Sequence, residues 1–412
     1  MFAQIASVLS NFLLLKILTE NLSTEQFGYY SLWLSIILFT RQVTYDPISI
    51  VAAKEVANSD LGNSKAPIIH QAIAGFSKKV ILFFLPAIIV FALFIYTKIG
   101  EIILLFFLIF GFLYVISNGP QGIYINLLNA EGFRKLSSIF ISLDGLIKLV
   151  LTTALVLMAS AKLEGAMIGV ALSSFLLFTA TRLFISGKNA NQLNQLQDKK
   201  NTLTNLFISS LPFVIPVAIM AIRSAGDKWF MASFLGVEKL AAYSVLLQLG
   251  FLPMTLLVGI FQTYLTPVIY NLAASKNTEN RKTLLKLIDK TFIKITLLSA
   301  IVTLLSYFLA DLFVSIAVGE DYLAFSYLLP AFVAAGAIFG LSNLSNVAAI
   351  GLFTSKETGL LMGFSVTLVV LVTALLIYHY DFIGGVIAIL LTSCISLFIY
   401  MYALHFWQPS KR

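Results

Sequence analysis

Long apolar stretches follow one another along the chain, separated by short polar loops. Twelve of them can cross a bilayer, because a helix needs about 20 mostly apolar residues to span the hydrocarbon. The first six are residues 2–18, 27–51, 80–96, 102–128, 136–159 and 165–185. The second six are residues 206–235, 240–269, 292–318, 324–350, 358–377 and 382–406. No loop exceeds about thirty residues, too few for an extramembranous catalytic domain. The pattern predicts an all-α integral membrane protein with about twelve transmembrane helices.

The composition agrees with this pattern. Of the 412 residues, 59% are hydrophobic and 11% are charged, whereas soluble domains are about 45–50% apolar and about 25% charged. The surplus apolar surface must face lipid. No basic region or cleavage site precedes the first apolar stretch, so we expect that stretch to be retained as a span. The single cysteine, Cys394, cannot form an internal disulfide and is interpreted as packing.

The positive residues predict an orientation. Of the 27 Lys and Arg residues, 19 lie in or beside the even-numbered loops and the C-terminal tail, and three, Lys98, Lys162 and Lys239, lie in the odd-numbered loops. Positive residues in short loops stay on the cytoplasmic side. Both termini are therefore predicted to be cytoplasmic, and the net charge of +8 needs no nucleic-acid partner. The basic stretch from Lys276 to Lys294 is interpreted as orienting charge at the headgroups.

The two halves of the chain repeat a short pattern. LSTEQFGYYSL (residues 22–32) matches LGVEKLAAYSV (residues 235–245). Glu25 matches Glu238, Tyr30 matches Tyr243 and Ser31 matches Ser244, all at an offset of 213. With six spans in each half, both halves start on the same side and the repeat is parallel. We predict two pseudo-symmetric six-helix bundles, residues 1–186 and 206–412, joined by a cytoplasmic linker, residues 187–205.

Eight charged residues of the predicted spans are interpreted as lying at bilayer depth, where each costs at least about 2.5–3.5 kcal/mol on insertion scales. They are the cations Lys16, Arg41, Lys148, Arg223 and Lys228 and the acids Asp46, Asp144 and Asp227. The cations outnumber the acids by two, which favours an anionic passenger. Eight of the ten prolines also lie within the spans, where each can kink its helix, and kinked helices suit alternating access.

Spacing along the helices predicts which charges are paired. Asp144 and Lys148 stand four residues apart, as do Arg223 and Asp227, so each pair can form a salt bridge on one helix face.

The remaining spacings predict charges without such a bridge. Arg41 stands five residues from Asp46, which is off register, and is expected to be unpaired. Lys16 is near the outer end of its span and can snorkel to the interface.

Several kinds of chemistry are missing from the sequence. The histidines His70, His379 and His405 lie far apart, without a second ligand at metal spacing. There is no G-x-x-x-x-G-K-[ST] loop and no G-x-G-x-x-G motif for nucleotides. We therefore predict a transporter without a cofactor, rather than an enzyme.

Three motifs carry a resemblance to a known family. They are L-x-x-E-x-F-G-Y-Y-S-L from Leu22, A-E-G-F-R-K from Ala130, and D-K-x-x-x-x-x-x-L-G from Asp227. Together they resemble the Wzx-type polysaccharide flippases of the multidrug/oligosaccharidyl-lipid/polysaccharide (MOP) exporter superfamily. The resemblance implies a MOP/MATE-like fold with a cationic central cavity. It implies transport of undecaprenyl-pyrophosphate-linked oligosaccharides, such as O-antigen units, from the cytoplasmic to the periplasmic leaflet of the bacterial inner membrane.

The resemblance also suggests roles for the eight charges. The substrate-binding residues would be Arg41 and Arg223, on the pyrophosphate or acidic sugars, assisted by Lys148, Lys228 and Lys16. The coupling or charge-partner residues would be Asp46, Asp144 and Asp227. Expected partners are the lipid-linked oligosaccharide, membrane lipid and other polysaccharide-assembly proteins, with a proton or sodium gradient as the driving force. One departure is Ala241, which replaces in the second half the glycine of F-G-Y-Y-S.

Three other functions compete with this prediction. A MATE-like cation-coupled drug exporter would share the helices but need unpaired acids to attract cationic drugs. A polysaccharide polymerase or ligase would need a long external loop, and every odd-numbered loop is short. A lipid II flippase usually has fourteen spans, two more than this pattern contains.

Overall fold

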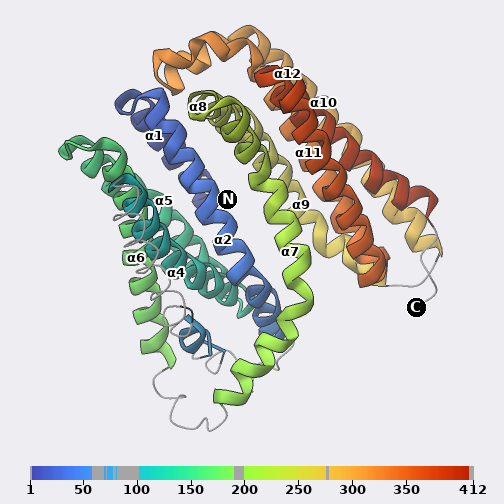
Figure 1. Cartoon of the computed structure of the whole chain (residues 1–412). Helices are drawn as coiled ribbons and strands as arrows, with labels where there is room; N and C mark the ends of the chain where they lie inside the picture. The colour runs from blue at the N-terminus through green and yellow to red at the C-terminus, as the bar shows by residue number, and fades with distance from the viewer. Residues whose placement is uncertain are drawn as a thin grey trace. The chain divides into compact units, whose positions relative to one another are not determined.

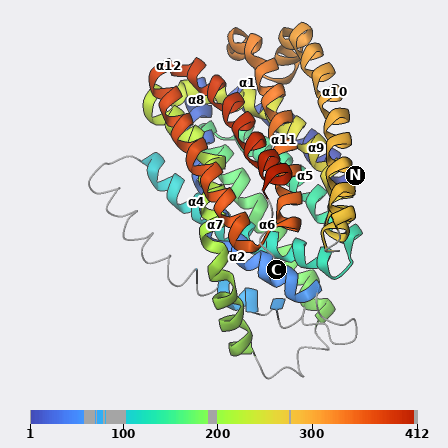
Figure 2. The same cartoon turned by 90° about the vertical axis from the view of Figure 1, so that its right-hand side faces the viewer.

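The computed structural model describes residues 2–57, 69–70, 72–77, 80, 102–189, 199–274 and 278–407, and these residues are almost entirely helical (Figures 1 and 2). The first half holds α1 (Phe2–Asn21), α2 (Thr24–Ala57), α4 (Ile102–Ala130), α5 (Arg134–Met158) and α6 (Lys162–Asn189). The second half holds α7 (Lys199–Leu235), α8 (Val237–Leu246), α9 (Leu252–Ala274), α10 (Thr278–Ala317), α11 (Leu329–Leu352) and α12 (Ser355–Phe406). The predicted all-α fold class is confirmed.

The helices follow the predicted spans closely. Eleven of the twelve spans lie within helical segments to within one residue, and the third, residues 80–96, lies outside the described residues apart from Val80. A π-helical turn, Leu247–Phe251, joins α8 to α9, and a 3-10 turn, Glu320–Leu328, precedes α11. Helix α12 covers two spans, because non-helical backbone at Tyr380 and Asp381 breaks it.

Eight helices of the described chain are long and apolar enough to cross a membrane. With 59% hydrophobic residues, the chain is a multi-pass membrane protein. The number of about twelve spans remains a prediction.

The chain divides into two compact units, Met1–Ala221 and Ile222–Arg412. The division falls within α7, so α1 to α6 belong to the first unit and α8 to α12 to the second. The predicted linker, residues 187–205, lies partly outside the described residues. The division of the chain into bundles that end at residue 186 and begin at residue 206 remains a prediction.

The internal repeat extends from the sequence to the start of matching helices. Helix α2 begins at Thr24 and α8 begins at Val237, at the same offset of 213 as the sequence match. Each helix carries an exposed acid in its first turn, and the repeated tyrosines, Tyr30 and Tyr243, are both buried. The matched residues therefore occupy equivalent places in the two units.

Helix packing repeats as well. Helix α2 packs along α4 in the first unit, as α9 packs along α11 in the second. A Cβ on Gly119 would lie 2.2 Å from the Tyr45 ring, and a Cβ on Gly340 would lie 2.6 Å from Val258. Tyr45 and Val258 differ by 213 positions, and Gly119 and Gly340 by 221. The same close approach, permitted by glycine, thus joins equivalent helices.

The last two spans of each unit form equivalent hairpins. Helices α5 and α6 lie side by side (Figure 1). A Cβ on Gly165 would lie 2.8 Å from the carbonyl oxygen of Leu155, and one on Gly384 would lie 2.0 Å from that of Leu376. Leu155 and Leu376 are 221 positions apart, so this offset relates α5 to the first part of α12.

Candidate functional site

Charged side chains gather in one cluster in each unit. In the first unit, Arg41 Nη2 on α2 lies 3.4 Å from Asp46 Oδ2, and the Arg41 side chain is only 19% exposed. The expectation that Arg41 is unpaired is wrong, because its long side chain reaches along the helix beyond the usual four-residue spacing. Gly122 of α4 approaches the same guanidinium: a Cβ there would lie 3.4 Å from Nη1.

Helix α5 adds two more charges to the first cluster. Gln121 Nε2 on α4 donates to Asp144 Oδ1 at 3.3 Å. Lys148 interacts electrostatically with Asp144 and with the buried tyrosines Tyr30 and Tyr114. Among the described residues, no carboxylate oxygen lies within 4.0 Å of the Lys148 ammonium, so the predicted Asp144–Lys148 salt bridge is not formed.

Tyr114 links these groups into one cluster. It interacts electrostatically with Arg41, Asp144 and Lys148, which come from α2 and α5, while Tyr114 itself is on α4. The structure thus brings Arg41 into one cluster with Asp144 and Lys148, which follow it more than a hundred residues later in the sequence.

The charged cluster of the second unit contains Arg223, Asp227 and Lys228, all on α7 (Lys199–Leu235). Arg223 Nη2 donates to Ser396 Oγ on α12 at 2.8 Å, and the Arg223 Cζ lies 4.7 Å from the centre of the Phe339 ring on α11. Ser365 Oγ donates to the same Ser396 Oγ at 3.3 Å. Within the described chain, no carboxylate oxygen lies within 4.0 Å of Arg223, so the predicted bridge to Asp227 is absent. Arg223 is a cation held by neutral groups.

Asp227 has other partners. Tyr243 on α8 donates its hydroxyl to Asp227 Oδ2 at 2.7 Å, and the backbone N–H of Lys228 donates to Oδ1 at 2.8 Å. The Lys228 ammonium interacts electrostatically with the same carboxylate. This acid is therefore satisfied within its own unit, without Arg223.

Lys16 occupies a different setting. Its Nζ lies 3.7 Å from Glu20 Oε1, its side chain is 39% exposed, and it is near the C-terminal end of α1. These features match the snorkelling interpretation of this residue.

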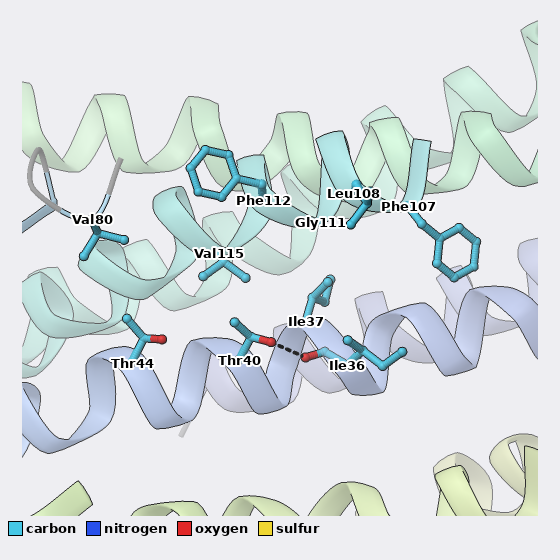
Figure 3. A pocket seen from close by; sticks show the side chains of 10 residues that line it. All are labelled: Ile36, Ile37, Thr40, Thr44, Val80, Phe107, Leu108, Gly111, Phe112 and Val115. Atoms are coloured by element: carbon cyan, nitrogen blue, oxygen red, sulfur yellow. Dashed lines mark hydrogen bonds between the residues drawn. The ribbon is translucent and has the colours of Figure 1, made fainter. Parts of the chain in front are cut away.

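The first unit also contains an apolar pocket of about 180 Å³ between α2 and α4 (Figure 3). Apolar side chains such as Ile37, Phe112 and Val115 line it, with Thr40 and Thr44 as its polar groups. The Thr40 hydroxyl already donates to the Ile36 carbonyl at 2.9 Å. The pocket, lined mostly by apolar side chains and by no charged residue, therefore suits hydrocarbon better than a phosphate.

Comparisons with known proteins identify the fold of this chain. No protein-family model and no curated protein sequence matches the chain. Its structure is similar to that of the lipid II flippase MurJ in an inward closed conformation, with a TM-score of 0.69 and 14% identity over 98% of this chain and 85% of MurJ. It is also similar to an inward-facing multidrug resistance MATE family transporter of the MOP superfamily, with a TM-score of 0.66 and 16% identity over 97% of this chain and 94% of that one. This chain has the MOP fold.

A third structure with the MOP fold is a transporter from Pyrococcus furiosus, described as having a binding pocket of reverse polarity and a different function. It has a TM-score of 0.57 and 15% identity to this chain, over 99% of this chain and 97% of its own. The predicted MOP/MATE-like fold class is confirmed. Identities this low show the fold alone, so the cargo has to be argued from the charges.

The two halves of the MOP fold in this chain do not share the cations within their spans. At the offsets that relate equivalent helices, Arg41 corresponds to Met254, Lys148 to Val369 and Arg223 to Ser10. A charge that the scaffold needed would be expected in both halves, since their packing repeats. These cations have apolar or neutral counterparts, so the repeated packing does not itself require a charge at these positions.

Neutral residues complete both clusters, and sequence reasoning missed them. Ser396, Phe339 and Gln121 are ordinary residues of apolar helices, and no local pattern distinguishes them. Tyr243 had a signal, because it is one of the identities of the internal repeat.

Tyr243→Phe is expected to lower stability by about 1–3 kcal/mol, because a carboxylate then loses a hydrogen-bond donor. The phenylalanine ring can keep the edge contact with Phe332, whose centre lies 5.4 Å from that of Tyr243. The melting temperature of the purified protein in detergent measures the loss. Tyr378→Phe removes a hydroxyl from an exposed side chain and serves as the control. Equal melting temperatures for the two variants would show that the Tyr243 hydroxyl does not stabilise the fold.

Proposed function

We propose that this protein is a flippase that moves an undecaprenyl-pyrophosphate-linked oligosaccharide from the cytoplasmic to the periplasmic leaflet of a bacterial inner membrane by alternating access. The activity is transport without a chemical step. The observation that carries the proposal is Arg223, a cation within a membrane span whose hydrogen-bond and ring partners are all neutral. Such a cation attracts an anion, because little else in its surroundings offsets its charge.

The geometry of Arg223 suits a pyrophosphate. A guanidinium has five N–H donors in a planar fork that binds phosphate oxygens in pairs. Ser396 accepts a hydrogen bond from Nη2, which leaves further donors for a ligand. The Phe339 ring, which faces the Arg223 Cζ, favours one orientation of the planar guanidinium. In the first unit, Lys148 is a separate candidate for binding an anion, since no acid lies within 4.0 Å of it among the described residues.

A MATE-like drug exporter is the second candidate, because a MATE family transporter is among the similar structures. A cationic drug would need an available carboxylate. Asp46 faces Arg41, Asp144 accepts from Gln121, and Asp227 accepts from Tyr243. Since each acid has a donor, we propose that they hold cations in place or respond to protonation when a proton or sodium gradient drives transport.

Reconstitution of the full chain in vesicles tests the two candidates. We expect a fluorescent undecaprenyl-pyrophosphate-linked oligosaccharide to move between leaflets at least tenfold faster with protein than without it. A membrane-impermeant quencher reports the fraction of label in the outer leaflet. Ethidium accumulation in vesicles with a proton or sodium gradient is the parallel assay for drug export. Gradient-driven ethidium transport together with unchanged lipid movement would overturn the flippase proposal in favour of the exporter.

A further inference from the structure

Helix α10 carries four lysines at regular spacing. Lys282, Lys286, Lys290 and Lys294 follow one another every four residues, and all four are exposed. A four-residue spacing places side chains on one helix face, so the lysines form a continuous stripe. We call these four residues the lysine stripe.

The opposite face of the same segment is fixed to the second unit. Leu284, Ile288 and Ile295 are buried in an apolar cluster with side chains of α11 and α12. Arg281 Nη2 donates to the carbonyl oxygens of Leu404 and Trp407, at 3.2 and 3.0 Å, where α12 ends. The lysine stripe therefore projects outward from a segment that is held in place.

The outward face continues as an apolar surface. Beyond Lys294, exposed side chains on this side of α10 include Leu297, Ile301, Leu304 and Phe308. The exposed apolar residues run from Ile293 to Ile316, which is about 35 Å at 1.5 Å per residue. This length is close to the hydrocarbon thickness of about 30 Å. Lys294 therefore lies at one boundary of the hydrocarbon.

The remaining lysines lie progressively farther from the hydrocarbon. Lys290 is about 6 Å farther along the helix axis than Lys294. Each headgroup layer is about 5–8 Å thick, so Lys290 and Lys294 fall at headgroup depth. Lys286, about 12 Å from Lys294 along the axis, and Lys282 lie beyond that layer.

The lysine stripe has no acidic partner in the described part of the protein. No ion pair within 4.0 Å involves any of its four ammonium groups. Asp289, on the same segment, instead lies 3.4 Å from Nε2 of His405. Four positive charges therefore point outward, and two of them are at the depth where lipid phosphates lie.

We infer that the lysine stripe is a binding site for the phosphate groups of anionic phospholipids in the cytoplasmic leaflet. The site is on the exposed face of α10 and is separate from the charges proposed to bind cargo. Positive charge at this depth attracts acidic headgroups, and the apolar surface beside it can contact their acyl chains. Such lipids would hold α10 at the membrane surface, on the side predicted to be cytoplasmic.

Native mass spectrometry of the delipidated full-length protein tests this site. The protein is titrated with phosphatidylglycerol or with phosphatidylcholine of the same acyl chains. We expect tighter binding of phosphatidylglycerol to the wild-type protein. We expect a roughly 30-fold loss of that affinity in K290Q/K294Q, from about 1 kcal/mol for each lysine. K290R/K294R should bind like the wild type, because it keeps both charges.

The control is K162Q/K239Q, which removes two exposed lysines from the predicted opposite side and should leave phosphatidylglycerol affinity unchanged. Equal affinity for the two lipids, or an unchanged affinity in K290Q/K294Q, would overturn the inference. A third titration, with undecaprenyl pyrophosphate, separates the sources of phosphate. If K290Q/K294Q weakened only this ligand, the stripe would be a cargo site and the inference would be wrong. Flipping in phosphatidylcholine vesicles does not depend on the stripe, so the proposed function stands or fails separately.

Discussion

Arg223→Ala is expected to abolish transport of the lipid-linked cargo while the protein remains folded and inserted. The substitution removes a cation whose partners are the Ser396 hydroxyl and the Phe339 ring, so no acid is left behind without its counter-charge. Hydrogen bonds to charged groups contribute about 1.5–3 kcal/mol each, so loss of a single such bond would weaken cargo binding roughly 10- to 150-fold. Surface-polysaccharide display in a flippase-deficient strain measures the effect, with membrane protein levels measured in parallel.

Two further variants make this test specific. Arg223→Lys keeps the charge but loses the planar fork, so we expect partial transport. Arg134→Ala makes the same chemical change at an exposed arginine at the start of α5 and should leave transport unchanged. Normal display by Arg223→Ala at wild-type protein levels would contradict an anionic cargo at this residue.

The helices were predictable because the hydrocarbon imposes a length. A span such as residues 102–128 has to be apolar for about 20 residues, which a single sequence reveals directly, and α4 covers that span. The repeat was predictable for a related reason. The pattern at Tyr30 and Tyr243 recurs because both side chains are buried at the start of equivalent helices.

The partners of the charges were not predictable from local spacing. Such spacing compares residues on one helix and paired Arg223 with Asp227. In the structure Arg223 bonds to Ser396, 173 residues away, and Asp227 bonds to Tyr243 on the next helix. Arg41 shows the opposite error, because it does reach Asp46 across five positions. Neutral tertiary partners leave no pattern in a single sequence.

The identity of the cargo also could not be predicted from the fold. The MOP fold occurs in a lipid II flippase and in multidrug transporters, so the same helices serve different passengers. What differs between such proteins is which side chains the helices carry. In this chain the candidate determinants are Arg223 and Lys148, whose counterparts in the internal repeat are uncharged.

Gly336→Ala is expected to cause a large loss of stability in the second unit. A Cβ at this position would lie 2.4 Å from the carbonyl oxygen of Phe251 and 2.8 Å from its Cα. These are backbone atoms of the π-helical turn between α8 and α9, so no side-chain rotation relieves the clash and α11 has to move. Overpacking of this kind costs about 1–3 kcal/mol or more. Thermal unfolding of the purified protein in detergent measures the loss.

Gly363→Ala is the matched control, because a Cβ there would meet nothing within 4 Å. It lies inside α12, where replacing glycine by alanine stabilises a helix by up to about 1 kcal/mol. The same added methyl group is thus expected to lower the melting temperature at Gly336 and to leave it equal or raise it at Gly363. If Gly336→Ala melted no lower than the wild type, α11 would not approach the π-helical turn as closely as described.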